Sequence, residues 1–541
     1  MYVIVYDFGT SAVKTSLFDI DTMIKMVCHA SAEYGLYILE NGGVEQDTEE
    51  WWNAITSTTK ELFTKTDVKP SEIAGLSFCT QMQSVVLVDR NGNTLRRPMN
   101  FLDTRAVNEF KEGLGKGLIK VSGCNAFKLL RNLIVNKTAS MSVKDPVYKY
   151  KWVEKNEPDI FRQVYKWLDV NDYLISRCTG NIVRTVDSAF STFLYDTRKG
   201  KEGWNIRLAR MYGVDPAHFP ELIECTDKAG KLSAKAAAEL GLPEGIPVFG
   251  GGGDATLTGI GAGCTKVGQT HIYVGTSGWV VTLMDHQAVD PLNSMTGVMA
   301  GLKGHFHYYA ELETAGKCFE WVRDHLALEE VGVYSQQKNI SEEHESKYKS
   351  LYDYLSDEVS KVPPGSHGVI FTPWMHGNRS PFEDPYAAGM FFNLRLENGK
   401  RDMIRAVLEG ICFHLRWLLE CESEKIKTSD TIRFVGGGAL SPVTCQMLAD
   451  ITGREIETID EPENAGAIGA ALIIALGMKI IDSTETAQKM IPVKAVYHPD
   501  PAAKAVYDRN YEVFLRLYKS NAKNFKALNS IRCSIQAKRK I

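Results

Sequence analysis

The chain has 541 residues, of which 44% are hydrophobic and 24% charged, the composition of an ordinary globular protein. At this length two large domains are expected, because a single core stops growing at roughly 250–300 residues. A formal net charge of -4 excludes the strongly basic surface typical of proteins that bind nucleic acid or anionic membranes.

The 11 cysteines are scattered, and no two of them form a Cys-x-x-Cys pair, so neither a zinc cluster nor a redox motif is predicted. An odd number of cysteines in a large chain favours reduced thiols and a cytoplasmic protein. The apolar run at residues 1–7 is too short for a signal peptide and predicts a strand. No apolar segment approaches the ~20 residues of a membrane helix, so no membrane partner is expected.

Residues 3–19 predict two strands joined by a turn at Gly9-Thr10-Ser11, because apolar residues alternate on both sides of the turn. Such a turn offers backbone N–H groups and two hydroxyls to a phosphate oxygen. Asp7, just before the turn, could hold a metal ion through water. The alternative is a plain hairpin with a polar tip.

A helix is expected to begin after Asp47, with Glu50 completing a capping box and Trp51 and Trp52 on the buried side. The tryptophans are expected in the core, not in a ligand platform.

A polar segment, Gln81-Met82-Gln83, lies between two predicted buried strands at residues 73–78 and 85–89. Polar side chains in this position would line the wall of a pocket. Asp103 and Arg105 are a second candidate pair for binding ligand hydroxyls. The alternative for this pair is a surface salt bridge.

Four consecutive glycines, Gly250 to Gly253, separate the apolar run at residues 246–249 from Asp254. Four glycines in a row lose much conformational entropy on folding, so a close approach of other groups to this backbone is expected. A tight turn at the end of a strand is the alternative explanation.

Residues 270–285 repeat the first pattern, with alternating apolar residues around Gly275-Thr276-Ser277. Two such hairpins indicate two related domains, each presenting a phosphate-binding turn to a shared cleft. This arrangement is similar to the actin-like, ribonuclease H-like ATPase fold. We therefore expect an α/β protein with two ribonuclease H-like, actin-like domains that face a central cleft. Neither a P-loop nor a well-placed G-x-G-x-x-G motif is present.

Residues 431–435 predict a strand, after which Gly436-Gly437-Gly438 would let a flat ligand approach the backbone. Ser441 and Pro442 predict the start of a helix that ends near Gly453. A strand, a glycine turn and a helix start in this order suit a nucleoside platform.

Two further segments are given structural interpretations. Small residues, including Gly466, Gly469 and Ala470, are expected to let another helix pack closely. The charged segment at residues 341–349 is expected to form a solvated helix face.

Together the motifs resemble those of the FGGY carbohydrate kinases over nearly the whole chain, and within that family the xylulokinases are most similar. The motifs are Asp7-Phe8-Gly9-Thr10-Ser11, Val44-Glu45-Gln46-Asp47, Asp172-Tyr173-Leu174, Gly251-Gly252-Gly253-Asp254, Gly275-Thr276-Ser277-Gly278, Gly377-Asn378-Arg379-Ser380-Pro381, Gly436-Gly437-Gly438-Ala439 and Gln446-Met447-Leu448-Ala449-Asp450. Several independent motifs in the same order make this resemblance specific. It implies an N-terminal domain over residues 1–250, a C-terminal domain over 251–490 and a helical extension over 491–541.

The resemblance implies ATP- and Mg²⁺-dependent phosphorylation of a ketose or related small polyol, with D-xylulose as the first choice. Asp254 matches the family's catalytic base, and Asp7 matches the residue near the magnesium ion. The implied nucleotide-binding residues are Thr10, Ser11, Gly275, Thr276, Gly437, Gly438 and Ala439. The implied substrate-binding residues are Gln81, Met82, Gln83, Asp103, Arg105 and Asp254. A homodimer is also suggested by the resemblance.

Three positions depart from the family pattern. Gln83 stands where xylulokinases have histidine, Ala255 stands where they have asparagine, and Asn393 replaces an expected glycine. The first two lie on the sugar side, where a lost hydrogen bond changes specificity strongly. Ribulose, an erythritol-type polyol and gluconate therefore remain alternative substrates. A non-catalytic sugar-binding regulator and a chaperone-type or filament-forming ATPase are alternative functions.

Overall fold

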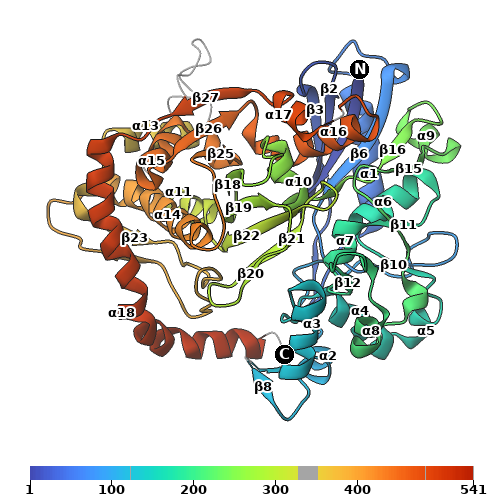
Figure 1. The fold of residues 1–541 in the computed structure, drawn as a ribbon, viewed down its shortest axis with the longest axis horizontal. Helices are drawn as coiled ribbons and strands as arrows, with labels where there is room; N and C mark the ends of the chain where they lie inside the picture. The colour runs from blue at the N-terminus through green and yellow to red at the C-terminus, as the bar shows by residue number, and fades with distance from the viewer. Residues whose placement is uncertain (122, 327–350, 482, 540–541) are drawn as a thin grey trace.

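The computed structural model describes residues 1–121, 123–326, 351–481 and 483–539 as a mixed α/β protein with two large sheets (Figure 1). The charged segment at residues 341–349, predicted as a solvated helix face, lies outside the described residues.

The first sheet has the strand order β15-β16-β6-β1-β2-β3, with β17 also pairing with β6. Its strands are β15 Lys228–Lys231, β16 Pro247–Phe249, β6 Ile73–Thr80, β1 Tyr2–Phe8, β2 Ala12–Asp19, β3 Lys25–Glu33 and β17 Gly252–Gly253. The second sheet has the order β20-β21-β22-β19-β18-β25-β26-β27. Its strands are β20 Val289–Asp290, β21 Met295–Met299, β22 Phe306–Leu312, β19 Gly278–Met284, β18 Thr270–Val274, β25 Thr431–Val435, β26 Glu455–Ile459 and β27 Val493–Tyr497.

The two sheets share one topology. Strands β3-β2-β1-β6-β16-β15 correspond in order to β22-β19-β18-β25-β26-β27. In both series the middle three strands are parallel and the remaining neighbours are antiparallel. The predicted hairpins are β1–β2 and β18–β19, and each occupies the same place in its sheet. Two related domains, predicted from these hairpins, are therefore confirmed.

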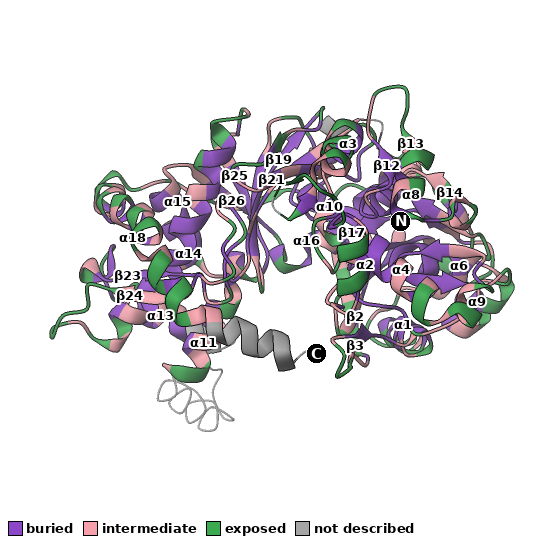
Figure 2. Cartoon of the chain, turned by 90° about the horizontal axis from the view of Figure 1, so that it is seen from below, coloured by how far each residue is buried: buried purple, intermediate pink, exposed green. Residues whose placement is uncertain are grey.

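Helices pack against both sheets or against other helices beside them. The principal ones are α1 Thr48–Leu62, α4 Pro146–Asn156, α6 Val170–Thr179 and α9 Ala234–Leu240 in the first half, and α14 Lys400–Ser423, α15 Pro442–Thr452 and α18 Pro501–Arg539 in the second. Figure 2 shows buried residues gathered along the strands and on the sheet-facing sides of the helices. The hydrophobic effect of these cores supplies most of the stability of the two halves.

Helices α10 (Asp254–Gly261) and α16 (Ala465–Gly477) lie between the two sheets (Figures 1 and 2). One buried cluster joins Val3 and Val5 of the first sheet to Val435 of the second through α16. A Cβ at Gly261 would overlap the Ala465 carbonyl oxygen. On α16, a Cβ at Gly469 would overlap Leu257 O of α10, so the close packing predicted for the small residues of α16 is confirmed at Gly469.

Most predicted helix ends are confirmed. Ser441 caps α15, with its Oγ accepting a hydrogen bond from Thr444 N at 3.2 Å, and Gly453 ends that helix in the left-handed region. Asp47 caps α1, with its carboxylate accepting from Glu49 N at 3.0 Å, and both tryptophans after it are buried.

The predicted capping box at α1 is wrong. The Glu50 carboxylate accepts hydrogen bonds from Gly35 N at 2.7 Å and from the Tyr37 hydroxyl. The preceding chain passes close to this side chain and offers it these donors in place of the helix terminus.

Asn393, which replaces an expected glycine, has a φ of 65°. Asparagine tolerates this left-handed conformation better than most residues. Its Nδ2 donates to Gly368 O at 3.0 Å. The departure from the family pattern therefore keeps the backbone conformation that glycine would supply.

The described residues contain no helix that is both long and apolar enough to cross a membrane. The ten cysteines from Cys28 to Cys445 carry free thiols.

Candidate active site

The glycine run ends at the first residue of α10, Asp254. A Cβ at Gly251 would overlap Phe78 O, one at Gly252 would lie 2.9 Å from Asp187 Oδ2, and one at Gly253 would overlap Met82 Sδ. The predicted close approach of other groups to this backbone is confirmed. The run places Asp254 directly beside β6 and the segment that follows it.

Asp254 is exposed to solvent, and its Oδ1 accepts a hydrogen bond from Ala255 N at 2.7 Å. The protein atoms packed around the carboxyl raise its pKa to about 6, mainly through desolvation, and the charge of Glu311 adds to this effect. A carboxylate with such a pKa is ionised at neutral pH and still a better base than an ordinary aspartate.

Asp7 lies at the end of β1 and is electrostatically coupled to Asp254. Desolvation raises the pKa of Asp7 to about 6, Lys14 opposes the rise and Asp254 adds to it. The structure therefore brings together the predicted base and the predicted metal-binding residue, one from each end of the N-terminal half.

The first predicted phosphate turn, Gly9 to Ser11, is exposed at Ser11. Two side chains from other segments hold its carbonyl groups by hydrogen bonds. The Tyr34 hydroxyl donates to Gly9 O at 2.5 Å, and Gln46 Nε2 donates to Thr10 O at 2.7 Å. These bonds engage the carbonyls of the turn. Its polar tip is left for a ligand.

The second predicted phosphate turn is fixed in a comparable way. Gly275 N donates to Ser277 O at 2.9 Å, and Gly316 N, at the start of α11 (Gly316–His325), donates to Gly275 O at 2.8 Å. Thr276 at the tip is exposed.

The predicted nucleoside platform forms a short 3₁₀ helix, η4 (Gly437–Leu440), between β25 and α15. Gly436 has a φ of 88°, and open space surrounds the Cα of Gly437. Gly438 packs against Val274, the last residue of β18, so a side chain there would meet that strand. Ala439 is buried. The glycine surface is thus adjacent to the second phosphate turn.

The predicted sugar-side loop follows β6. Gln81 is buried in a triangle of side-chain amides: its Nε2 donates to Gln46 Oε1 at 2.8 Å, and its Oε1 accepts from Asn100 Nδ2 at 2.9 Å. Met82 accepts a long hydrogen bond from Thr256 Oγ1 at 3.9 Å. The loop therefore packs against the segment that carries Asp254.

Asp103 and Arg105 form a buried ion pair at 2.7 Å, not a surface one. Arg105 also pairs with Glu45 at 2.7 Å and lies over the Trp152 ring. Both oxygens of Asp103 accept hydrogen bonds from the protein, including one from Val44 N at 2.9 Å. The partners of this pair lie in the segment that carries Val44 and Glu45, and its direct contact with a substrate stays a prediction.

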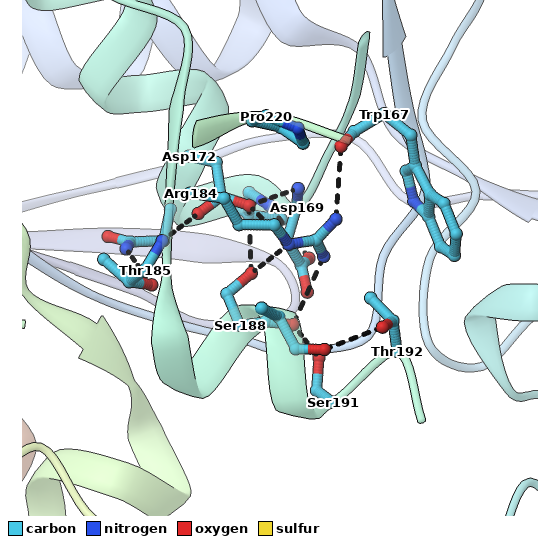
Figure 3. Close-up of polar contacts among 12 residues, drawn as sticks. Trp167, Asp169, Asp172, Arg184, Thr185, Ser188, Ser191, Thr192 and Pro220 are labelled. Carbon is cyan, nitrogen blue, oxygen red and sulfur yellow. Dashed lines mark hydrogen bonds and ion pairs between the residues drawn. The ribbon is translucent and has the colours of Figure 1, made fainter. Parts of the chain in front are cut away.

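Beneath the loop lies a buried polar network that the sequence motifs did not identify as a unit (Figure 3). Arg184 Nε lies 3.3 Å from Asp172 Oδ2, and both side chains are fully buried. Ser188 Oγ donates to Asp172 at 2.9 Å, and Arg184 Nη1 donates to Trp167 O at 3.1 Å. In the sequence, Asp172 belongs to one of the motifs of the resemblance, and the Asp169-x-x-Asp172 spacing at the start of α6 forms a capping box, but neither pattern points to Arg184 or Ser188.

This network reaches the glycine run through a second aspartate. Asp187 Oδ2 accepts a hydrogen bond from Gly253 N at 2.9 Å, and Asn171 Nδ2 donates to Gly250 O at 2.9 Å. The position of Asp254 is therefore fixed by side chains far away in sequence.

From the second half, Glu311 and Arg379 form an ion pair at 2.7 Å, with the Arg379 side chain 63% exposed. The influence of Glu311 on the pKa of Asp254 places this pair near the candidate base. Arg379 belongs to one of the motifs of the resemblance, whereas nothing in the sequence marked Glu311.

Solved structures with the same fold include the ligand-bound xylulose kinase from Lactobacillus acidophilus, which has a TM-score of 0.82, 24% sequence identity, and coverage of 97% of this chain and 99% of that one. The duplicated topology and this likeness define an α/β protein of the actin-like, ribonuclease H-like class. Profiles of the FGGY family of carbohydrate kinases match residues 2–261 (N-terminal domain) and 271–478 (C-terminal domain). The chain belongs to the FGGY family of carbohydrate kinases, which are sugar phosphotransferases.

Two curated relatives illustrate the range of substrates in the family. The xylulose kinase of Lactococcus lactis is 30% identical over 529 residues, covering 96% of this chain and 97% of the relative. The gluconokinase of Bacillus subtilis is 26% identical over 521 residues, covering 95% of each.

The carboxylate of Asp7 fits Mg²⁺ as a ligand. No group of three or more His, Cys, Asp or Glu side chains among the described residues could hold a metal ion. Mg²⁺ in phosphoryl-transfer sites needs only one or two carboxylates, because phosphates and waters complete its coordination. The Asp7 carboxylate, at the end of β1 and near Asp254, meets this requirement.

Proposed function

We propose that the chain transfers the γ-phosphoryl group of ATP to a hydroxyl of a small sugar, with D-xylulose as the first-choice substrate. The observation that carries the proposal is the position of Asp254, beside the sugar-side loop and electrostatically coupled to Asp7. The names of the xylulose kinase relatives support the choice of sugar.

In the proposed reaction the oxygen of the sugar hydroxyl bonds to the γ-phosphorus while the bond between that phosphorus and the ADP oxygen breaks. Asp254 accepts the proton that the hydroxyl loses. Asp7 would hold Mg²⁺. When bound, this ion neutralises charge on the phosphates. Backbone N–H groups at Thr10, Ser11 and Thr276 would bind phosphate oxygens, and Gly275, whose N–H donates to Ser277 O, would line the second phosphate turn.

The remaining assignments complete the proposal. Gly437, Gly438 and Ala439 would contact the nucleoside, and Gln81, Met82 and Gln83 would orient the sugar, with Asp103 and Arg105 behind them. The division into residues 1–250, 251–490 and 491–541, the homodimer and the cytoplasmic location remain predictions of the same proposal.

Gluconate is a second candidate substrate. The exposed guanidinium of Arg379 lies near Asp254, and a sugar-acid carboxylate could pair with it. The gluconokinase relatives give this alternative its support.

A substrate panel tests the proposal. ADP release is measured with D-xylulose, D-ribulose, erythritol and D-gluconate, and the phosphorylated product is identified by mass spectrometry. We expect the highest kcat/KM with D-xylulose. A higher kcat/KM with gluconate would make gluconate the substrate in place of D-xylulose. Sugar binding without turnover would favour a non-catalytic regulator. ATP hydrolysis without any sugar would favour a chaperone-type or filament-forming ATPase.

The pH dependence of kcat/KM tests the base, because kcat/KM reports the pKa values of the free enzyme. Asp254 acts in its ionised form and its pKa is about 6, so kcat/KM should rise as the pH increases through about 6 and then level off. The measurement is kcat/KM between about pH 5 and about pH 8, with the sugar below its KM. A constant kcat/KM over this range, in protein shown to stay folded, would argue against a base of raised pKa.

A further inference from the structure

The backbone at Gln83 has a φ of 63°, a left-handed conformation that non-glycine residues rarely adopt. Such residues persist where the surrounding structure holds them, and they cluster at functional sites. Gln83 is one of the positions at which this chain departs from the xylulokinase pattern. What holds its backbone therefore bears on the sugar-side loop.

Two buried charged side chains grip the peptide groups on both sides of the Gln83 Cα. Asp169 Oδ2 accepts a hydrogen bond from Gln83 N at 2.8 Å, and its Oδ1 accepts from Ser84 N at 2.9 Å. Lys149 Nζ donates to Gln83 O at 2.7 Å and to Asn100 O at 2.9 Å. Together these bonds fix both backbone dihedrals of Gln83.

Lys149, on α4, is fully buried. Its hydrogen-bond acceptors are the two backbone carbonyls. The charged groups that face it are Asp103, Asp145, Asp169 and Lys144, and burial lowers the pKa of Lys149 to about 8. Lysine is almost never fully buried, because losing its hydration is unfavourable. A residue needed only to fill this space would be apolar.

The grip also reaches the rest of the site. Asn100, whose carbonyl Lys149 binds, donates its side-chain amide to Gln81 and Gln46, and Gln46 holds the first phosphate turn through Thr10 O. On the other side of the loop, Met82 lies against Gly253. A shift of the loop would therefore move both the first phosphate turn and the glycine run before Asp254.

We propose that Lys149 is a positioning residue which, together with Asp169, holds the Gln83 backbone in its left-handed conformation and so sets the geometry of the sugar-side loop. The kinetic consequence rests on the proposed function. The hydrogen bonds that Lys149 and Asp169 form with the backbone of residues 83 and 84, called the backbone clamp below, do not depend on the proposed function. The clamp and its kinetic consequence are tested separately.

The chain offers a matched control for Lys149. Lys166, on β10 (Lys166–Leu168), also donates to two backbone carbonyls, Ala217 O at 2.9 Å and Phe219 O at 2.7 Å, but these belong to another loop. Both Lys149→Met and Lys166→Met remove a charge and two hydrogen bonds to backbone carbonyls, although Lys166 is half-buried and Lys149 is fully buried. Only the first touches the sugar-side loop.

Hydrogen–deuterium exchange tests the clamp without reference to activity. In Lys149→Met the amides of residues 83 and 84 should exchange at least about tenfold faster than in the wild type, because the segment opens more often. In Lys166→Met they should exchange at the wild-type rate. Equal protection in the two variants would overturn the proposal. If Lys149→Met does not fold, Asp169→Asn, which weakens the other half of the clamp, must show the same local increase.

Kinetics test the consequence for the substrate. In Lys149→Met the KM for the best sugar should rise about tenfold or more, with smaller changes in kcat and in the Kd for ATP. The same substitution should cost at least about threefold less in a Gln83→Gly background, because glycine adopts the left-handed conformation unaided. An equal penalty in both backgrounds would show a merely structural role for Lys149. If the wild type phosphorylated no sugar, the proposed function would be wrong. The hydrogen–deuterium exchange result would still test the clamp.

Discussion

Replacing Asp254 with asparagine should lower kcat by about 10²–10⁴-fold, the usual contribution of a general base, while leaving the Kd for ATP nearly unchanged. The amide cannot accept the hydroxyl proton, but it occupies the same space at the start of α10. Loss of the charge also removes one of the influences that raise the pKa of Asp7. Steady-state kinetics with the best sugar and calorimetry with ATP measure the two quantities.

Asp285→Asn is a suitable control, because this exposed carboxylate follows β19 and its close partner is the exposed His286. It should have wild-type kcat. If Asp254→Asn retained more than about a tenth of the wild-type kcat, Asp254 could not be the base.

The buried pair of Arg184 and Asp172 carries the largest expected effect on stability (Figure 3). Arg184→Met leaves a fully buried carboxylate without its countercharge, which costs about 3–5 kcal/mol in the free energy of unfolding. Burial already raises the pKa of Asp172, and Arg184 opposes that rise. Urea denaturation followed by tryptophan fluorescence measures the first unfolding transition of the N-terminal half.

Two comparison variants make this prediction specific. Arg198→Met breaks a pair with Asp196 at 2.7 Å whose arginine is 39% exposed, and should cost only about 0–1 kcal/mol. Adding Asp172→Asn to Arg184→Met should restore part of the stability, because the uncompensated charge is removed. A loss at Arg184 no larger than at Arg198 would contradict the prediction.

Local patterns were sufficient for much of the fold. The alternation around Gly9 to Ser11 and around Gly275 to Ser277 predicted both hairpins, because strand periodicity and turn chemistry act over a few residues. The cap at Ser441 and the helix end at Gly453 were predictable for the same reason. The hydrogen bonds of Glu50 were not predictable, since its partners come from a different segment.

In the candidate site, too, features set by local sequence could be predicted and features set by distant segments could not. The backbone-dominated parts, namely the two turns, the glycine run and the 3₁₀ turn at Gly437, could be predicted because glycine sequences mark close approaches of the main chain. The grip on Gln83 by Lys149 and Asp169 could not, since nothing local to Gln83 indicates a left-handed φ.

The sequence by itself determined the duplicated α/β domains, the family and the residue expected to act as base. The tertiary structure alone decided that Asp254 and Asp7 interact, that Asp103 and Arg105 are a buried pair, and that Lys149 lies under the sugar-side loop. The physical reason is range. Propensity, capping and turn chemistry act between neighbours in sequence, whereas desolvation and charge pairing depend on which segments folding brings together.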